Sequence, residues 1–196
     1  MSTIYTVNNK VLKNSVTDKW LIKKEAPSFQ EITIGNQIWM SKNLAIDDGG
    51  EGISTRELTN VNGYNLGTQY YYTEAAAVRI ANSIEGWHLP TNAEVIDMTN
   101  YIYSSAGLKL KSTYAWSDYN GNSGNGTDIY GFCALPVSLY PVNQSTPDGQ
   151  YAYFWTSTSY NASNYYCFQL KHSTQKLTVG NKASSTQLSV RLIKDS

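Results

Sequence analysis

Two helical segments meet at the stretch Gly86-Trp87-His88-Leu89-Pro90-Thr91-Asn92-Ala93-Glu94-Val95, which carries the strongest local signal in the sequence. Thr91 and Glu94 have the spacing of a capping box, in which side chain and backbone at the helix start bond reciprocally. The pattern predicts a helix from about Asn92 to Ser104 that Gly107 stops. Its buried face would carry Val95, either Met98 or Thr99, and Ile102. Pro90 would fix the entry angle and Trp87 would anchor the approach in the core.

The segments on either side of this stretch predict an α+β fold. Upstream we expect a tight hairpin over Glu31–Met40 with Gly35-Asn36 as its turn, a loop over Asp47–Asn65, a short strand Tyr70–Tyr72 and a helix Glu74–Ala81 capped by Thr73. Downstream we expect a loop Ser117–Thr127 and strands over Ala152–Thr158, Tyr165–Lys171, Lys176–Val179 and Leu188–Ile193. Strands, then two helices, then strands, without βαβ alternation, indicate an α+β fold with an antiparallel sheet.

The first residues are predicted to form a separate small unit. Ile4–Val7 and Lys19–Ile22 have strand character, and Val11-Leu12 is a candidate to pair between them. A lone hairpin of this size is marginal in water, so it must pack on the main domain or on a neighbouring subunit. Its lysines are either a solvated face or part of an attachment arm. We place the boundary at Ala26–Ser28, which gives a hairpin arm at 1–28 and a ligand-binding domain at 29–196.

Composition excludes several classes of function. The 196 residues carry 15 basic and 15 acidic side chains, so there is no electrostatic footprint for nucleic acid. No apolar run approaches the length that spans a membrane, and no secretory signal opens the sequence as it stands. Sixteen tyrosines accompany only four phenylalanines. Such richness in Tyr, Ser, Asn and Gly is typical either of an adaptable binding surface or of a β-rich protein.

Catalytic and metal-binding patterns are weak. Neither His88 nor His172 belongs to a hydrolase or metalloprotease motif, and we expect His88 to be structural. Cys133 and Cys167 lack metal-ligand spacing and are expected to be free thiols. Asp118-x-Asn120-x-Asn122 alternates like a calcium loop, but Ser123 and Ile129 occupy its sixth and twelfth positions. Asp47, Asp48 and Glu51 form a second weak candidate. We therefore expect no enzyme and no resident metal, with calcium the one cofactor left open.

A binding surface is the remaining hypothesis. If Tyr166, Phe168 and Leu170 face the core, alternation along the strand turns Tyr165, Cys167 and Gln169 outward. Tyrosine would supply rigid contact area, and serine and asparagine would supply hydrogen bonds. The candidate ligand-binding residues are Trp116, Tyr119, Tyr153, Tyr160, Asn161, Ser163, Asn164, Tyr165, Cys167, Gln169 and Lys171.

Five motifs in order carry a family resemblance. They are the Ile-Gly-Asn-Gln-x-Trp-Met start (Ile34–Leu44), Gly-Trp-His-Leu-Pro-x-x-x-Glu (Gly86–Glu94), Gly-Phe-x-Ala-Leu-Pro (Gly131–Pro136), an aromatic-Trp run (Phe154–Thr158) and a closing Ser-Val-Arg (Ser189–Arg191). Together they resemble the Fibrobacter succinogenes major paralogous domain across residues 30 to 195. The resemblance does not include the first 28 residues.

That family is similar to the C-type lectin fold, which implies two helices, a mixed, mostly antiparallel sheet and long loops that form a ligand surface. A cysteine often follows the closing motif; Leu192 stands there, so a disulfide from that position is absent. The Glu-Pro-Asn and Trp-Asn-Asp sugar–calcium motifs of C-type lectins are missing. The same fold hosts variable proteins of diversity-generating retroelements, including receptor binders at phage tail tips, and Ser159–Cys167 resembles their variable tract.

The resemblance implies a receptor- or ligand-binding module, an adhesin, on a virion tail or an extracellular surface. Its partner would be a host-surface protein or glycan, with no nucleic acid and no membrane insertion. Multivalent display in a homo-oligomer such as a trimer, or in a larger assembly, would raise avidity. Two alternatives remain: a cell-surface domain with a fixed ligand, and an enzyme of the sulfatase-activating type that uses Cys133 and Cys167.

Overall fold

The computed structural model describes residues 5–7, 10–12 and 29–195. At the N-terminus β1 (Tyr5–Val7) pairs antiparallel with β2 (Lys10–Leu12), and Val11 lies opposite Thr6. This confirms the expected pairing of Val11-Leu12. The strand predicted at Lys19–Ile22 and the boundary at Ala26–Ser28 lie outside the described residues.

A four-stranded antiparallel sheet joins the two ends of the main domain. Its order is β3 (Glu31–Ile34), β4 (Gln37–Met40), β11 (Ile193–Lys194) and β7 (Trp87–His88). The β3–β4 turn is Gly35-Asn36 as predicted, and Gly35 takes a φ of 64° that glycine adopts without strain. Ile193 is the register partner of both Trp39 and His88. The last strand therefore joins the Gly86–Val95 stretch to the β3–β4 hairpin.

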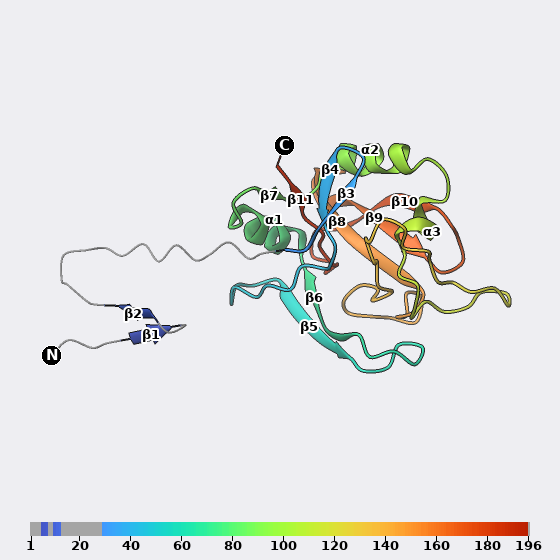
Figure 1. Cartoon of the computed structure of the whole chain (residues 1–196), viewed down its shortest axis with the longest axis horizontal. Helices are drawn as coiled ribbons and strands as arrows, with labels where there is room; N and C mark the ends of the chain where they lie inside the picture. Colours follow the sequence, from blue (N-terminus) through green and yellow to red (C-terminus); the bar gives the residue numbers. More distant parts are fainter. Residues whose placement is uncertain (1–4, 8–9, 13–28, 196) are drawn as a thin grey trace.

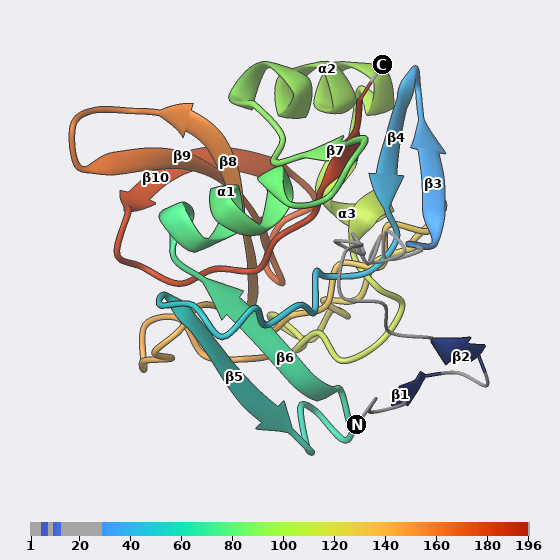
Figure 2. The same ribbon diagram turned by 90° about the vertical axis from the view of Figure 1, so that its left-hand side faces the viewer.

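The remaining described strands form two further antiparallel sheets. One has the order β10 (Leu177–Ala183), β9 (Asn164–Lys171), β8 (Tyr151–Ser159), and the other pairs β5 (Ile53–Leu58) with β6 (Gly67–Tyr72). Figures 1 and 2 show the β5–β6 hairpin at the opposite end of the domain from α2 (Asn92–Ile102). The α+β class with antiparallel sheets is therefore confirmed.

Several strands differ from the prediction, and β6 itself begins at Gly67 rather than at Tyr70. The segment Ile53–Leu58 is a strand where we expected loop, because the Tyr-rich β6 supplies its ladder partner. The predicted strand Leu188–Ile193 shrinks to β11, and Leu188 makes only an isolated bridge to Tyr72. In contrast, β10 extends to Ala183, well past the predicted Val179.

The helix starts were predicted correctly and one helix end was not. Thr73 caps α1 (Glu74–Asn82) by accepting from the Ala76 amide. At α2 the capping box is complete: the Glu94 amide donates to Thr91 Oγ1 at 3.2 Å, and the Thr91 amide donates to Glu94 Oε2 at 2.7 Å. The helix ends at Ile102, two residues before the expected end at Ser104.

Gly107 does not stop the helix, which corrects the prediction. It lies inside a short helix α3 (Ala106–Leu110), where the backbone of a neighbouring turn passes close by. A Cβ at Gly107 would lie 2.5 Å from the carbonyl oxygen of Lys176. The glycine is therefore required for a close approach between segments rather than for a helix terminus.

Both faces of the β8–β9 ladder are covered by apolar clusters. Trp155 and Cys167 belong to the cluster that contains α1, whereas Phe154, Phe168 and Leu170 belong to the cluster that contains α2. Val95, Met98 and Ile102 form the buried face of α2, as the spacing predicts. Within the described residues, no helix has both the length and the apolar character needed to cross a membrane.

His88 ties the start of α2 to the end of the chain. Its Nε2 lies 2.9 Å from Glu94 Oε1 and its Nδ1 lies 2.6 Å from Asp195 Oδ1. Burial opposes charge on the ring, but the hydrogen bonds to Glu94 and Asp195 outweigh it and raise the pKa of His88 above 6.5. The residue is structural, as expected.

His88→Gln should lower stability in a pH-dependent way. Because the folded pKa is raised, the imidazolium stabilises the fold fully below pH 6.5, and this contribution is lost as pH rises through the folded pKa. The check is urea unfolding of both proteins between about pH 5 and pH 9. A difference in unfolding free energy that shrinks toward high pH is expected; one that is constant or grows with pH would contradict the assignment.

Candidate functional site

Five of the eleven predicted binding residues share one face of the β8–β9–β10 sheet. Tyr165, Cys167, Gln169 and Lys171 alternate along β9. Tyr153 is the register partner of Gln169, and Lys182 on β10 is the partner of Tyr165. The Lys182 ammonium lies 5.0 Å from the centre of the Tyr153 ring. The face is therefore aromatic and basic.

The middle of this face is not exposed, which corrects one expectation. Cys167 is only 2% exposed and Tyr153 only 3% exposed. The strand-alternation argument assumed that one side of β9 meets solvent, but the α1 cluster covers it. Phe168 and Leu170 are buried as predicted, Tyr166 is half-buried, and Tyr165, Gln169 and Lys171 are half-buried at the two ends of the strand.

One accessible end is the β8–β9 turn, which we call the tip (Tyr160–Tyr165). Tyr160 is 51% exposed, and its ring meets the Tyr166 ring at 5.3 Å in an edge-to-face contact. Asn161 Oδ1 accepts from the amides of Ser163 and Asn164, both at 2.9 Å. The turn is thus held by its own side chain, while Tyr160 and Ser163 remain at the surface.

The other accessible end of the sheet carries Tyr119 but not Trp116. The Trp116 indole is buried, and its Nε1 donates to Ser112 Oγ and to the Ala134 carbonyl, both at 3.1 Å. Tyr119 is 47% exposed and packs edge-to-face on His172 at 5.3 Å. Because β9 separates His172 from the tip, the predicted residues form two sites at opposite ends of the sheet.

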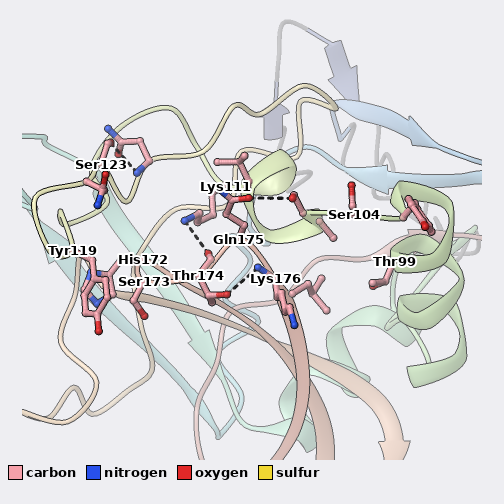
Figure 3. A pocket seen from close by; sticks show the side chains of 17 residues that line it. Thr99, Ser104, Lys111, Tyr119, Ser123, His172, Ser173, Thr174, Gln175 and Lys176 are labelled. Carbon is pink, nitrogen blue, oxygen red and sulfur yellow. Dashed lines mark hydrogen bonds between the residues drawn. The ribbon is translucent and has the colours of Figure 1, made fainter.

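A cavity of about 800 Å³ lies beside Tyr119, and we call it the hollow. Its walls are the end of α2 with the turn into α3 (99–106), the loop 119–125 and the β9–β10 turn (172–177). Figure 3 shows Tyr119 and His172 at one end, Thr99 and Ser104 at the other, and Lys111 and Gln175 between them. Hydroxyl and amide side chains make up most of the lining.

Lys111 links the walls of the hollow through hydrogen bonds. Its side chain is buried, and its Nζ donates to the carbonyls of Gly124 at 2.6 Å, Lys171 at 3.3 Å and Thr174 at 3.4 Å. The ammonium also lies 5.0 Å from the Trp116 ring centre. Among the described residues no carboxylate pairs with it. A cation thus joins two loops that no regular strand pairing connects.

Replacing Lys111 by methionine should change how stability depends on pH. Burial lowers the pKa of Lys111 to about 8 from 10.5, so between these values the unfolded chain binds more protons than the folded protein. This group therefore makes the free energy of unfolding rise with pH across that window. Denaturant unfolding of wild type and Lys111→Met at stepped pH tests this, and an equal slope in the two proteins would contradict it.

Neither cysteine has the properties of an activated nucleophile. Both are free thiols, as expected. Burial raises the pKa of Cys167 to about 12, and burial together with the Asp128 carboxylate raises the pKa of Cys133. Reactive cysteines depend on the opposite shift, which favours the thiolate.

The weak metal candidates are engaged in protein contacts. Asp48 accepts two hydrogen bonds from the Arg79 guanidinium, at 2.8 and 3.1 Å. Tyr119 and Asn122 pair across a tight turn through both backbone amides, which occupies part of the calcium-like loop. Within the described residues no group of three His, Cys, Asp or Glu side chains is placed to hold a metal ion.

Several residues of the hollow were not predicted from the sequence. Tyr103 at the end of α2 is 88% exposed and has a φ of 66°, and Gln175 and Lys176 come from the β9–β10 turn. Lys111 ends the run Leu108-Lys109-Leu110-Lys111 and is buried, although lysine is usually exposed. No local sequence pattern predicts the positive φ of Tyr103.

Comparison with known proteins gives one family. A family model described as the Fibrobacter succinogenes major domain matches residues 32–194. No curated protein and no solved structure matches the chain.

Proposed function

The chain belongs to the Fibrobacter succinogenes major domain family, and from this premise we propose that it is a non-enzymatic recognition module that binds its ligand at the tip. One observation carries the proposal. The tip displays Tyr160 and Ser163 on a turn fixed by Asn161, and the strands behind it are buried on both faces. A rigid scaffold that presents adaptable side chains is what recognition surfaces need.

The chemistry of the remaining side chains supports binding rather than catalysis. The raised pKa values of Cys133 and Cys167 leave a sulfatase-activating mechanism without a thiolate. His88 is engaged by two carboxylates, and His172 Nδ1 lies 3.3 Å from the Ser117 carbonyl. Neither the two cysteines nor the two histidines therefore offer a nucleophile beside a free base.

A more specific form of the proposal is that a retroelement diversifies the residues of the tip. The exposed residues of the tract cluster at the turn, where substitution changes the surface without opening the core. Cys167, Phe168 and Leu170 lie behind it and are buried. A module of this kind would act as a receptor binder on a phage tail or another extracellular surface. The ligand would be a host-surface protein or glycan, engaged by an oligomer. The alternative is the same surface with one fixed ligand.

Binding to intact cells tests the recognition proposal. Fluorescently labelled full-length chain is titrated onto a panel of intact cells, and bound protein is measured by flow cytometry. The double variant Tyr160→Ala, Tyr165→Ala should lose about tenfold or more in apparent affinity, because tyrosines carry much of such interfaces and both side chains reach the surface of the tip.

Tyr64→Ala is the matched control, since Tyr64 is similarly exposed and has a tyrosine neighbour, Tyr114, at 5.2 Å. It should bind as wild type does. Equal binding by the tip variant and the control, or no binding to any cells, would overturn the proposal.

A further inference from the structure

The hollow has the chemical character of a second binding site. Eleven of its seventeen lining residues carry a hydroxyl or amide group, and none of the described residues that line it is Asp or Glu. Lys111 and Lys176 lie in its walls, and neither has an ion-pair partner within residues 29–195. In a chain whose net charge is zero, these two cations favour an acidic ligand in the hollow.

Two amides in the lining are oriented so that their donors are free. Asn125 Oδ1 accepts from the Trp116 amide at 3.0 Å, and Gln175 Oε1 accepts from Ser105 Oγ at 3.1 Å. Within residues 29–195 neither NH₂ group has a protein partner. Each oxygen is therefore held by the protein while the nitrogen is left to a ligand that accepts hydrogen bonds.

Aromatic side chains stand at both ends of the hollow. Tyr119 is braced edge-to-face by His172. Tyr103 lines the α2 end, where Thr99 and Ser104 lie in Figure 3. Tyr103 combines a positive φ with an 88% exposed side chain, so burial does not offset its backbone strain. Strain that packing does not explain points to function.

We infer that the hollow binds an acidic oligosaccharide, with Tyr119 and Tyr103 stacking on sugar rings and Asn125, Gln175 and Lys176 donating to hydroxyl and carboxylate oxygens. The C–H face of a sugar ring carries positive partial charge and packs on the negative face of a tyrosine ring. A cavity of about 800 Å³ accommodates more than one sugar residue.

Lys111 has a specific part in this site. In many binding loops a metal ion organises the backbone carbonyls, and here the Lys111 ammonium holds the carbonyls of Gly124 and Thr174 in that way. We therefore expect binding at the hollow to be independent of calcium. The site lies at the opposite end of β9 from the tip, so this inference does not depend on the function proposed for the tip.

An oligosaccharide array tests the inference with the full-length chain. The array carries uronate and sialate oligosaccharides beside neutral oligosaccharides of the same length. Hits are then titrated by calorimetry with calcium and with a chelator. We expect binding to acidic members in both conditions. Tyr119→Ala and Tyr103→Ala should each weaken it about tenfold, and Lys176→Gln should reduce the preference for acidic over neutral chains.

Tyr101→Ala is the matched control, because Tyr101 is exposed at the end of the same helix but does not line the hollow. It should bind as wild type does, and so should Tyr160→Ala, which separates this site from the tip. Three results would each overturn the inference: no acidic oligosaccharide binds, binding requires calcium, or Tyr119→Ala and Tyr103→Ala bind as tightly as Tyr101→Ala.

Discussion

Arg191→Met should destabilise the fold by about 3–5 kcal/mol, because it strips hydrogen bonds from a buried site where water cannot replace them. Arg191 is 1% exposed. Its Nε donates to Asn43 Oδ1 at 2.8 Å, its Nη1 donates to the carbonyls of Phe132 at 2.6 Å and Met40 at 3.0 Å, and its Nη2 donates to the Cys133 carbonyl at 3.2 Å. The guanidinium also lies 4.5 Å from the Phe132 ring centre.

Urea unfolding followed by tryptophan fluorescence measures the loss. Arg191→Lys should also be clearly destabilised, since a single ammonium cannot reproduce the planar set of donors. Arg79→Met is the control, because its ion pair with Asp48 is at the surface, and its unfolding midpoint should stay close to that of wild type. If Arg191→Met and Arg79→Met have the same free energy of unfolding, the hydrogen bonds of Arg191 do not stabilise the fold as argued.

Trp155→Ala should cost about 3–5 kcal/mol, mostly through the cavity that it opens. Trp155 is fully buried in the cluster that contains α1, and its Nε1 donates to the Tyr72 carbonyl at 2.7 Å. It thereby joins β8 to β6 directly behind the scaffold that carries the tip. Loss of this side chain should loosen the tip as well as lower stability.

Trp155→Phe separates packing from hydrogen bonding. It keeps most of the apolar area and loses the N–H donor, so we expect a smaller cost of about 1–2 kcal/mol. Chemical denaturation of the three proteins tests whether the free energy of unfolding falls in the order wild type, Trp155→Phe, Trp155→Ala. Equal stability of the alanine variant and wild type would contradict the packing described.

Local signals in the sequence were sufficient for much of the fold. The Thr73 cap, the Thr91–Glu94 capping box and the Gly35-Asn36 turn depend only on neighbouring residues, and the structure has them as predicted. The same is true of the spacing of Val95, Met98 and Ile102. The strand Ile53–Leu58 was missed because its stability comes from β6, and the role of Gly107 was missed because it depends on the distant Lys176 backbone.

The candidate site was predicted only in part for the same reason. Alternation correctly grouped Tyr165, Cys167 and Gln169 on one face of β9, but it could not show that a helix covers the middle of that face. The tip was recognisable from its Tyr, Asn and Ser content. The hollow was not, because Lys111, Tyr119 and Gln175 come from three separate segments that only the folded chain brings together.

The measurement that tests the central claim most directly is deep sequencing of the 3′ end of this gene across its source population. If the chain is a diversified recognition module, substitutions should concentrate at the accessible positions Tyr160, Asn161, Ser163, Asn164, Tyr165, Gln169 and Lys171. The buried Trp155, Phe168 and Leu170 and the segment Ser189–Arg191 should stay unchanged. Uniform low variation across residues 160–171, or variation that falls equally on the buried positions, would contradict diversification at the tip.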